Sequence, residues 1–457
     1  MVLYEINTWV WLGELTRKYG RTVTLADVPA EEWDGIARWG FDSVWLMGVW
    51  ERSPAGAKIA REHPGLASEF AAALPDLTSA DVIGSPYAVH RYVVDAHLGG
   101  QAALAIARRE LAARGLRLLL DFVPNHVAVD HSWTIEHPGY FVHDQAGIAN
   151  GRDPYFPPWT DTAQLNIFRP ETRQALLETL LDIGEQCDGV RCDMSILLLN
   201  DVFSRTWGGN APATEFWGDV IPIVRARIPE FILMAEAYWD LEYTMQQLGF
   251  DYCYDKRLYD GLVHGDAYAI RLHLTADLHY QNKLIRFLEN HDEPRAAAVL
   301  PPEKLRAAVV VAATLPGAKL FHEGQLEGRR IKLPVQLARR AAEPADTGLE
   351  NFYQRVLKAA GALEGDWQLC ETSGWPDNPS HTNLLAWTWS GFVIVVNYSS
   401  HPAQGRIKVG QAVSFPYCRL TDQITGEIFD REGNELQAEG LFVNLAPWQV
   451  HFLRFDA

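Results

Sequence analysis

Short apolar runs alternate with amphipathic helical stretches from the N-terminus to about residue 365, and few folds accommodate this pattern. Such alternation is typical of βα units, which build a parallel sheet. The runs expected to form strands are Leu3–Leu12, Asp42–Met47, Leu116–Phe122, Gly189–Asp193, Phe231–Glu236, Phe250–Tyr254, Leu284–Leu288 and Ala318–Phe321. Helices are expected over Glu31–Trp39, Ala102–Arg114, Thr172–Gln186, Thr214–Ile228, 302–314 and 348–363. Eight βα units favour a closed (β/α)8 barrel over an open sheet.

Two connections in this pattern are much longer than ordinary βα loops of about 2–6 residues. They cover residues 48–99 and 125–171, and the second is rich in Asp, His, Pro and Trp. Both leave the barrel at the C-terminal face, where active sites form. We therefore predict a catalytic barrel over residues 1–124 and 172–365, with a small inserted domain at 125–171.

The pattern changes near residue 365. From Trp387 onward the chain alternates as strands do, most clearly at Phe392–Asn397 and Leu441–Leu445, with a turn expected at Glu432-Gly433-Asn434. Alternation with a period of two and frequent turn residues indicates antiparallel strands. Residues 366–457 are therefore predicted to form a C-terminal β-sandwich domain.

The charge and cysteine content exclude several classes of protein. Lys and Arg number 40 against 58 Asp and Glu, a net charge of −18, and such an acidic surface repels nucleic-acid phosphates. The 5 Cys residues are scattered, with no short Cys-x-x-Cys pair, which argues against disulfides and a zinc site. We see no secretory leader and no apolar run near the roughly 20 residues of a membrane span. A cytoplasmic protein with no nucleic-acid or membrane partner is expected, and its oligomeric state is left open.

Acidic or polar clusters follow four of the expected barrel strands. The segments are Asp121-Phe-Val-Pro-Asn125-His126, Gly189-Val-Arg191-Cys-Asp193, Ala235-Glu236 and Glu289-Asn-His291-Asp292-Glu-Pro-Arg295. One such cluster is most simply a charge that faces solvent at a strand end. Four clusters at the same face of a barrel indicate a site, because buried carboxylates are costly unless they are paired.

Cleavage of a glycosidic bond requires this set of groups. One carboxyl group protonates the leaving oxygen, and a second carboxylate stabilises or attacks the developing oxocarbenium ion. Arg191 lies two residues before Asp193, so both side chains point to the same side of the strand, and the cation would keep Asp193 ionised. Glu236 has apolar sequence neighbours, which would favour its protonated form and suit a general acid.

These four segments resemble, in order and spacing, the four short signature regions of the α-amylase family, the family 13 glycoside hydrolases. The last segment is especially close to the Glu-Asn-His-Asp-x-Pro-Arg run of fungal-type α-amylases. The resemblance covers the whole chain, from the barrel through the inserted domain to the C-terminal β-domain. Four regions in register form a far more specific signal than any one of them.

The resemblance implies a role for each matching residue. Asp193 would be the nucleophile, Glu236 the general acid/base, and Asp292 the stabiliser of the transition state. The residues implied to bind substrate are Tyr87, His126, Arg191, His291 and Arg295. Asp121 and Asn125 are interpreted as structural, as are Asp240 and Glu327 outside the motifs. Calcium is common in the family, yet the Asp-rich metal loop of some relatives is absent from residues 13–27, so neither a metal nor another cofactor is predicted.

The chain also departs from the family's patterns. Ile196 and Leu197 stand where α-amylases carry a Lys-His pair that contacts leaving-side sugars, which we interpret as a more apolar leaving side suited to short substrates. The run from Tyr87 to Tyr92 lacks the acidic residue of the exo-acting α-glucosidases. Residues 161–166 resemble the family's fifth region in a variant closer to transglycosylating members.

The predicted function is a retaining α-glycosidase that acts on α-linked gluco-oligosaccharides or small α-glucosides. The alternatives are a transglycosylase or a disaccharide isomerase with the same catalytic residues, or an inactive amylase-like binding module. The inactive module is disfavoured because Asp193, Glu236 and Asp292 are all present. The exact linkage, and endo against exo action, are left open by the sequence.

Overall fold

The computed structural model describes residues 1–409 and 417–456. Eight parallel strands form a closed barrel in the order β1-β14-β13-β12-β11-β10-β5-β2, which confirms the predicted (β/α)8 fold. The strands are β1 (Val2–Asn7), β2 (Ser43–Met47), β5 (Arg117–Phe122), β10 (Gly189–Cys192), β11 (Ile232–Ala235), β12 (Tyr252–Tyr254), β13 (Leu284–Arg286) and β14 (Ala318–His322). Nearly all of their residues are buried, as in parallel sheets covered on both faces.

Each helical stretch predicted from the sequence forms a helix. These are α2 (Ala30–Ala37), α5 (Gly100–Ala112), α7 (Pro170–Gly184), α9 (Phe216–Arg227), α15 (Pro302–Thr314) and α16 (Thr347–Ala360). The remaining helices are α1 (Thr8–Tyr19), α3 (Pro54–Glu62), α4 (Pro64–Ala73), α6 (Trp133–Glu136), α8 (Asn200–Trp207), α10 (Glu242–Gln247), α11 (Lys256–Val263), α12 (Ala267–Leu274), α13 (Leu278–Asn282), α14 (Ala296–Val299) and α17 (Gly433–Ala438). Among the described residues, no helix is both long and apolar enough to cross a membrane.

The first strand is shorter than predicted. A strand was expected over Leu3–Leu12, but β1 ends at Asn7 and α1 begins at Thr8. The Asn7 side chain accepts a hydrogen bond from the Val10 amide at 3.4 Å, which caps the helix. An apolar run cannot show this boundary, because Val10 and Leu12 are buried in the helix as they would be in a strand.

The described chain forms two compact units. Unit 1 comprises Met1–Tyr254 and Ile331–Ala342, and unit 2 comprises Asp255–Arg330 with the chain from Glu343 onward. In unit 1 the long connection after β2 holds α3 and α4 together with β3 (Trp50–Arg52) and β4 (Val89–Val94). The connection after β5 holds two short hairpins, β6 (His126–Ala128) with β9 (Thr162–Gln164) and β7 (His143–Asp144) with β8 (Gly147–Ile148).

A returning segment, Ile331–Ala342, packs on the β2 connection within unit 1. The Ile83 amide donates to the Gln336 carbonyl at 2.8 Å, and Arg339 forms ion pairs with Asp76 and Asp81. The Arg52 guanidinium donates to the carbonyls of Gly84 at 2.6 Å and Val335 at 2.9 Å. These bonds fix the loop that leads directly into Tyr87.

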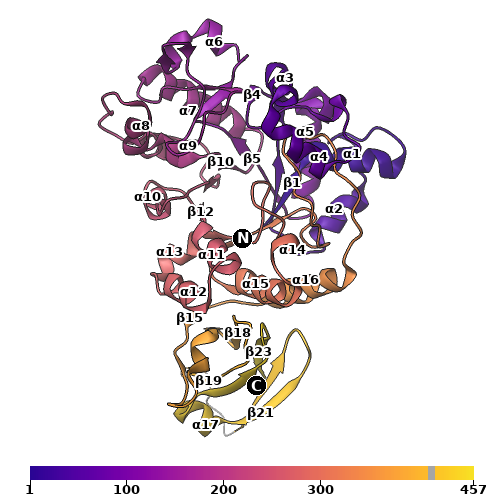
Figure 1. The fold of residues 1–457 in the computed structure, drawn as a ribbon, viewed down its shortest axis with the longest axis vertical. Helices are drawn as coiled ribbons and strands as arrows, with labels where there is room; N and C mark the ends of the chain where they lie inside the picture. The colour runs from indigo at the N-terminus through magenta and orange to yellow at the C-terminus, as the bar shows by residue number, and fades with distance from the viewer. Residues whose placement is uncertain (410–416, 457) are drawn as a thin grey trace. The chain divides into compact units, whose positions relative to one another are not determined.

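Unit 2 ends in two antiparallel sheets that enclose an apolar core. The larger sheet has the order β15 (Gln368–Leu369), β17 (Leu384–Trp389), β18 (Phe392–Asn397), β23 (Val450–Asp456), β20 (Tyr417–Asp422) and β21 (Ile428–Glu432). The smaller sheet has the order β16 (Thr372–Ser373), β19 (Ala403–Ile407) and β22 (Leu441–Leu445). Figure 1 shows these strands beside α12 and α15, and the Trp389 indole donates to the Thr314 carbonyl at 2.8 Å.

One connection in the C-terminal part differs from its prediction. A turn was expected at Glu432-Gly433-Asn434, whereas the chain forms helix α17 over Gly433–Ala438. Leu436 on this helix is buried in the core between the sheets. Burial of one leucine favours a helical turn that the sequence pattern alone does not show.

A buried network in unit 2 joins Asp255 to Arg286 and His273. Arg286 contacts the carboxylate, and the His273 ring lies 2.9 Å from it. Burial by itself raises the pKa of Asp255, but the Arg286 cation and His273 lower it to about 2.

We expect Asp255→Asn to lower the free energy of unfolding by about 3–5 kcal/mol, because it leaves the Arg286 charge buried without its partner. Urea denaturation at pH 7 measures this loss.

The control is Asp260→Asn, which removes a half-exposed ion pair with Lys256 and should cost less than about 1 kcal/mol. Since the pKa of about 2 in the folded state lies below the unfolded value of about 3.9, the contribution of Asp255 is complete above that unfolded value. It is lost as the pH falls through about 2. Equal unfolding midpoints for the two variants at pH 7 would contradict the assignment.

Candidate active site

Strand β10 carries the centre of the candidate site. A Cβ at Gly189 would lie 2.6 Å from the Ile232 carbonyl oxygen, so only glycine lets β10 approach β11 this closely. Arg191 pairs in register with Asp121 on β5 and Met234 on β11. This close packing buries the Arg191 side chain completely and places Asp193 directly after the strand.

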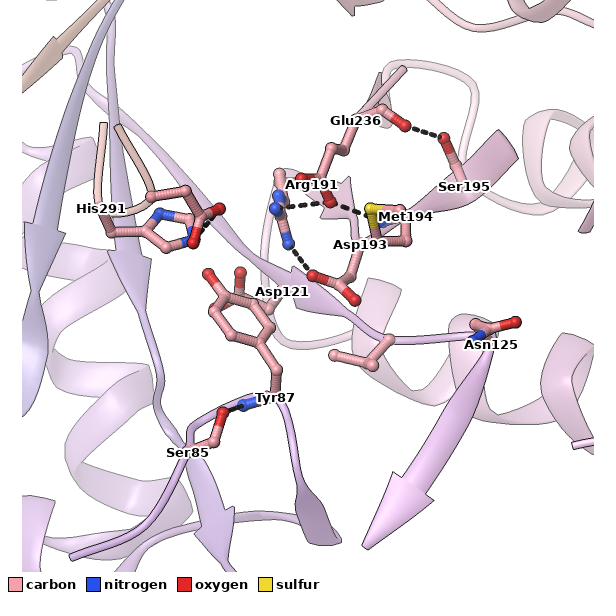
Figure 2. Close-up of polar contacts among 12 residues, drawn as sticks. Ser85, Tyr87, Asp121, Asn125, Arg191, Asp193, Met194, Ser195, Glu236 and His291 are labelled. Carbon is pink, nitrogen blue, oxygen red and sulfur yellow. Dashed lines mark hydrogen bonds and ion pairs between the residues drawn. The ribbon is translucent and has the colours of Figure 1, made fainter. Parts of the chain in front are cut away.

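The Arg191 guanidinium contacts both catalytic candidates of unit 1. Its Nη1 atom donates to Asp193 Oδ1, and its Nη2 atom lies 2.7 Å from Glu236 Oε2 (Figure 2). Asp193 is 6% exposed and Glu236 3% exposed, so water does not screen these charges strongly. Two carboxyl groups are therefore held at the two ends of one planar cation.

The surroundings of Glu236 differ from the apolar setting inferred from its sequence neighbours. Besides Arg191, its Oε2 atom accepts a hydrogen bond from the Met194 amide at 2.6 Å, and its Oε1 atom accepts one from the Tyr238 hydroxyl at 2.7 Å. The Ser195 hydroxyl donates to the Glu236 carbonyl at 2.7 Å. The chain brings polar donors from neighbouring loops to this carboxyl group, and its orientation is consequently fixed.

Aromatic rings enclose the other sides of Arg191. Its guanidinium carbon lies 5.0 Å from the centre of the Tyr87 ring, 5.5 Å from Trp45 and 5.9 Å from Tyr254. Burial by itself lowers the pKa of Arg191, but Glu236, Tyr87 and Asp193 raise it well above its usual value. The cation is therefore permanent and cannot give up a proton to its partners.

Asp121 supports this arrangement from β5, in keeping with its interpretation as structural. Its carboxylate accepts hydrogen bonds from the Trp45 indole at 3.2 Å and from the Gly48 amide at 2.8 Å. Its carbonyl accepts one from the Trp50 indole at 2.7 Å. Gly48 has a φ of 77°, a left-handed conformation that glycine adopts without strain.

His126 and Asn125 lie at the start of the inserted segment. The His126 Nε2 atom lies 3.2 Å from the Tyr87 carbonyl oxygen, and the ring is tilted against Trp159. Burial lowers the pKa of His126, against the opposing effect of Asp193 and Asp161. The imidazole is therefore neutral near pH 7, as suits a hydrogen-bond donor to an uncharged sugar.

Asn125 is held by side chains of the inserted segment. Its Oδ1 atom accepts a hydrogen bond from Gln164 at 3.0 Å, and its Nδ2 atom contacts His126. Calcium requires 6–8 oxygen ligands, typically including carboxylates. Within residues 1–409 and 417–456, no group of three or more His, Cys, Asp or Glu side chains is arranged to hold a metal.

The remaining candidates follow β13 in unit 2. His291 Nε2 lies 3.0 Å from Asp292 Oδ2, and the Asp292 side chain is 50% exposed. The Asp292 amide donates to Asn290 Oδ1 at 2.9 Å. Arg295 is buried and pairs with Glu289 at 2.6 Å, so its guanidinium fixes the loop that carries His291 and Asp292.

The structure thus brings five predicted residues together in unit 1: Tyr87, His126, Arg191, Asp193 and Glu236. His291, Asp292 and Arg295 belong to unit 2. The sequence interpretation missed Tyr238, Met194 and Gln164, each of which holds a site residue in place. Tyr238 could have been found from its position two residues after Glu236, but a backbone amide such as that of Met194 has no sequence signal.

The predicted role of Ile196 and Leu197 in contacting the leaving group is wrong, because neither side chain is accessible. Ile196 and Leu197 were expected to line an apolar leaving side, but they are 0% and 3% exposed. Both lie in the short 3-10 turn Ser195–Leu198, and their side chains pack into the interior. Any apolar contact with a leaving group must therefore come from other residues.

The pKa of His126 provides a test of this geometry. Because the Asp161 carboxylate raises that pKa, the variant Asp161→Asn should lower it further. Titration of the histidine ring resonances by NMR measures the shift. Asp144→Asn, an exposed change in the same inserted segment, serves as the control. A His126 pKa that rises in Asp161→Asn would show that the two groups do not interact in this way.

No family profile matches the chain, but individual proteins do. The α-amylase MalA of Haloarcula japonica is 25% identical over 432 residues, which cover 90% of this chain and 57% of MalA. This chain therefore spans little more than half the length of that relative. The α-1,4-glucan:maltose-1-phosphate maltosyltransferase of Burkholderia pseudomallei is 27% identical over 220 residues, or 47% of this chain and 18% of that protein.

Solved structures resemble the whole chain. The maltogenic α-amylase AmyB of Thermotoga neapolitana superposes with a TM-score of 0.72 at 17% identity, covering 100% of this chain and 99% of AmyB. The α-amylase of Geobacillus thermoleovorans in complex with acarbose gives a TM-score of 0.71 at 18% identity, covering 100% of this chain and 98% of that one. At this level of identity the likeness concerns the fold.

Proposed function

We propose that this chain, which belongs to the α-amylase family, is a retaining α-glycosidase for α-linked gluco-oligosaccharides or small α-glucosides. The observation that carries the proposal is the contact of one buried guanidinium with both Asp193 and Glu236. Two carboxyl groups in fixed positions are what double displacement at a glycosidic carbon requires.

In the first step, Asp193 attacks the anomeric carbon while Glu236 gives a proton to the leaving oxygen. Arg191 donates a hydrogen bond to Asp193 Oδ1 and so orients the carboxylate that attacks. The product of this step is a β-linked glycosyl ester on Asp193. In the second step, Glu236 takes a proton from water, the water attacks the ester, and Asp193 is released as a carboxylate.

The other matching residues complete the proposal. Asp292 stabilises the transition state through the sugar hydroxyls, and His126 and His291 hydrogen-bond the sugar at the cleavage subsite. Tyr87 stacks on that sugar and at the same time covers one face of Arg191. Arg295 supports the loop that carries His291 and Asp292 through its ion pair with Glu289. We therefore propose that Arg295 affects substrate binding by positioning that loop.

Transfer to a sugar acceptor is the second candidate function. It uses the same ester on Asp193 and differs only in which hydroxyl attacks that ester. The observation that favours it is the similarity of about half of this chain to maltosyltransferases. Product analysis with and without an added sugar acceptor distinguishes transfer from hydrolysis.

The assignment of the two carboxyl groups predicts a trapped intermediate. We expect Asp193→Asn and Glu236→Gln to lower kcat on α-glucosides by at least about a thousandfold. With α-glucosyl fluoride, Glu236→Gln should still form the ester, because fluoride leaves without an acid, but the ester should not be hydrolysed quickly. Intact-protein mass spectrometry should then show one added hexosyl group on the peptide that contains Asp193.

Asp201→Asn is the matched control, since Asp201 is an exposed carboxylate on α8 paired only with nearby Arg205 in the ion pairs described. It should keep the turnover of the parent protein and accumulate no ester. A label on Asp292 in place of Asp193 would overturn the assignment.

The same mechanism fixes the stereochemistry of the product. Two inversions at the anomeric carbon restore the α-configuration, so the first sugar released should be the α-anomer. NMR during the first minutes of the reaction, before mutarotation, measures it. A panel of α-1,4, α-1,6 and α-1,1 glucosides supplies the substrates, and release of the non-reducing-end sugar as the β-anomer from any of them would exclude double displacement.

A further inference from the structure

A cavity lies among the helices that follow the last two barrel strands. Helices α14, α15 and α16 lie side by side in unit 2 (Figure 1), and all three line the cavity, which has a volume of about 260 Å³. Leu300, Leu305 and Leu349 belong to its lining, and each of them is 4% exposed. The cavity therefore has a buried apolar floor.

The backbone restricts the walls of this cavity. Gly328, in the loop after β14, has a φ of 72°, and a Cβ there would lie 3.1 Å from the Leu349 side chain. Glycine therefore lets this loop approach α16 closely and without strain. Pro302 and Pro344 also line the cavity, and proline limits the backbone further. Walls of this kind lose little conformational entropy when a ligand binds.

Two guanidinium groups line the same cavity, Arg306 on α15 and Arg330 after β14. Arg330 Nη1 donates to the Ala297 carbonyl, and the Arg330 amide donates to Glu343 Oε2 at 2.7 Å. The Arg306 guanidinium carbon lies 5.9 Å from the centre of the Phe352 ring. In the described part of the chain, neither guanidinium forms an ion pair. Both cations are therefore held in place while most of their donors are left for a ligand.

The charges of the lining match a ligand with one negative charge. The lining holds two guanidinium cations and one carboxylate, that of Asp346, which leaves one net positive charge. Asp346 Oδ1 accepts a hydrogen bond from the Leu349 amide at 3.0 Å, so this carboxylate caps α16. A guanidinium presents parallel N–H donors that fit the two oxygens of a carboxylate.

We propose that this cavity binds a small amphipathic monocarboxylate, with its apolar part on the leucine floor and its carboxylate on Arg306 and Arg330. An uncharged apolar molecule would leave the two cations unpaired, and an inorganic anion would leave the floor unfilled. None of the lining residues is a candidate catalytic or substrate-binding residue. The inference therefore goes beyond the proposed function and does not depend on it.

A ligand-observed NMR titration with hexanoate tests the proposal. Hexanoate joins one carboxylate to a short apolar chain, and we expect a Kd of about 1 mM, which is ordinary for so small a ligand. Hexan-1-ol, which lacks the charge, and inorganic phosphate, which lacks the chain, should each bind at least about tenfold more weakly. Either of them binding as well as hexanoate, or no binding of hexanoate, would refute the amphipathic site.

Variants of the lining locate the binding. Arg306→Gln and Arg330→Gln each remove one charged hydrogen-bond donor and should raise the Kd for hexanoate by about tenfold. Ala345→Trp, at an exposed position of the lining, should fill the cavity and abolish binding. The unfolding temperature of each variant shows whether it is folded.

The matched control is Arg355→Gln. Arg355 is an exposed arginine on α16 that does not line the cavity, so its loss removes the same charge and should change the Kd by less than about twofold. An equal loss of affinity in this control would reduce the effect to net charge and overturn the proposal. A Kd that is unchanged in folded Arg306→Gln and Arg330→Gln would place the ligand elsewhere, with the same consequence.

Discussion

The buried Arg191 guanidinium is the charge on which unit 1 depends. A cation without water around it must have acceptors on all sides, and the chain supplies Asp193 and Glu236 in its plane. Aromatic rings cover it elsewhere. Asp193 has the reverse requirement, since its carboxylate could not be buried as an ion without this cation. The site and the fold around β10 therefore stabilise each other.

This mutual dependence determines how the loops are arranged. Tyr87 covers Arg191 only because the β2 connection is held by Asp121, by Arg52 and by the returning segment Ile331–Ala342. The loop after β11 is held from the other side, through Met194 and Tyr238 on the Glu236 carboxyl group. Loops this long would lose much entropy on ordering, and these charged hydrogen bonds offset that cost.

In unit 2 the buried Arg286 guanidinium fixes the backbone and contacts no candidate catalytic residue in the ion pairs described. Arg286 on β13 is neutralised by Asp255, which His273 also contacts, and none of the three residues belongs to the signature regions. Arg295 is likewise neutralised by Glu289, close to His291 and Asp292. Both pairs fix the backbone around a strand end, and only the second lies beside residues proposed to contact the sugar.

The sequence by itself determined the closed barrel and the approximate positions of most of its strands, because both rest on local periodicity, and its short motifs carry the resemblance to the α-amylase family. It could not show that β1 ends at Asn7, that Ile196 and Leu197 are buried, or that Glu236 is held by polar donors. The end of β1 depends on a local cap that an apolar pattern does not show. The burial of Ile196 and Leu197, and the contacts of Glu236 with Arg191 and Met194, depend on segments distant in the chain. The meeting of Tyr155 with Trp239 was decided only by the tertiary structure, since neither residue carries a motif and the two lie in segments distant in the chain.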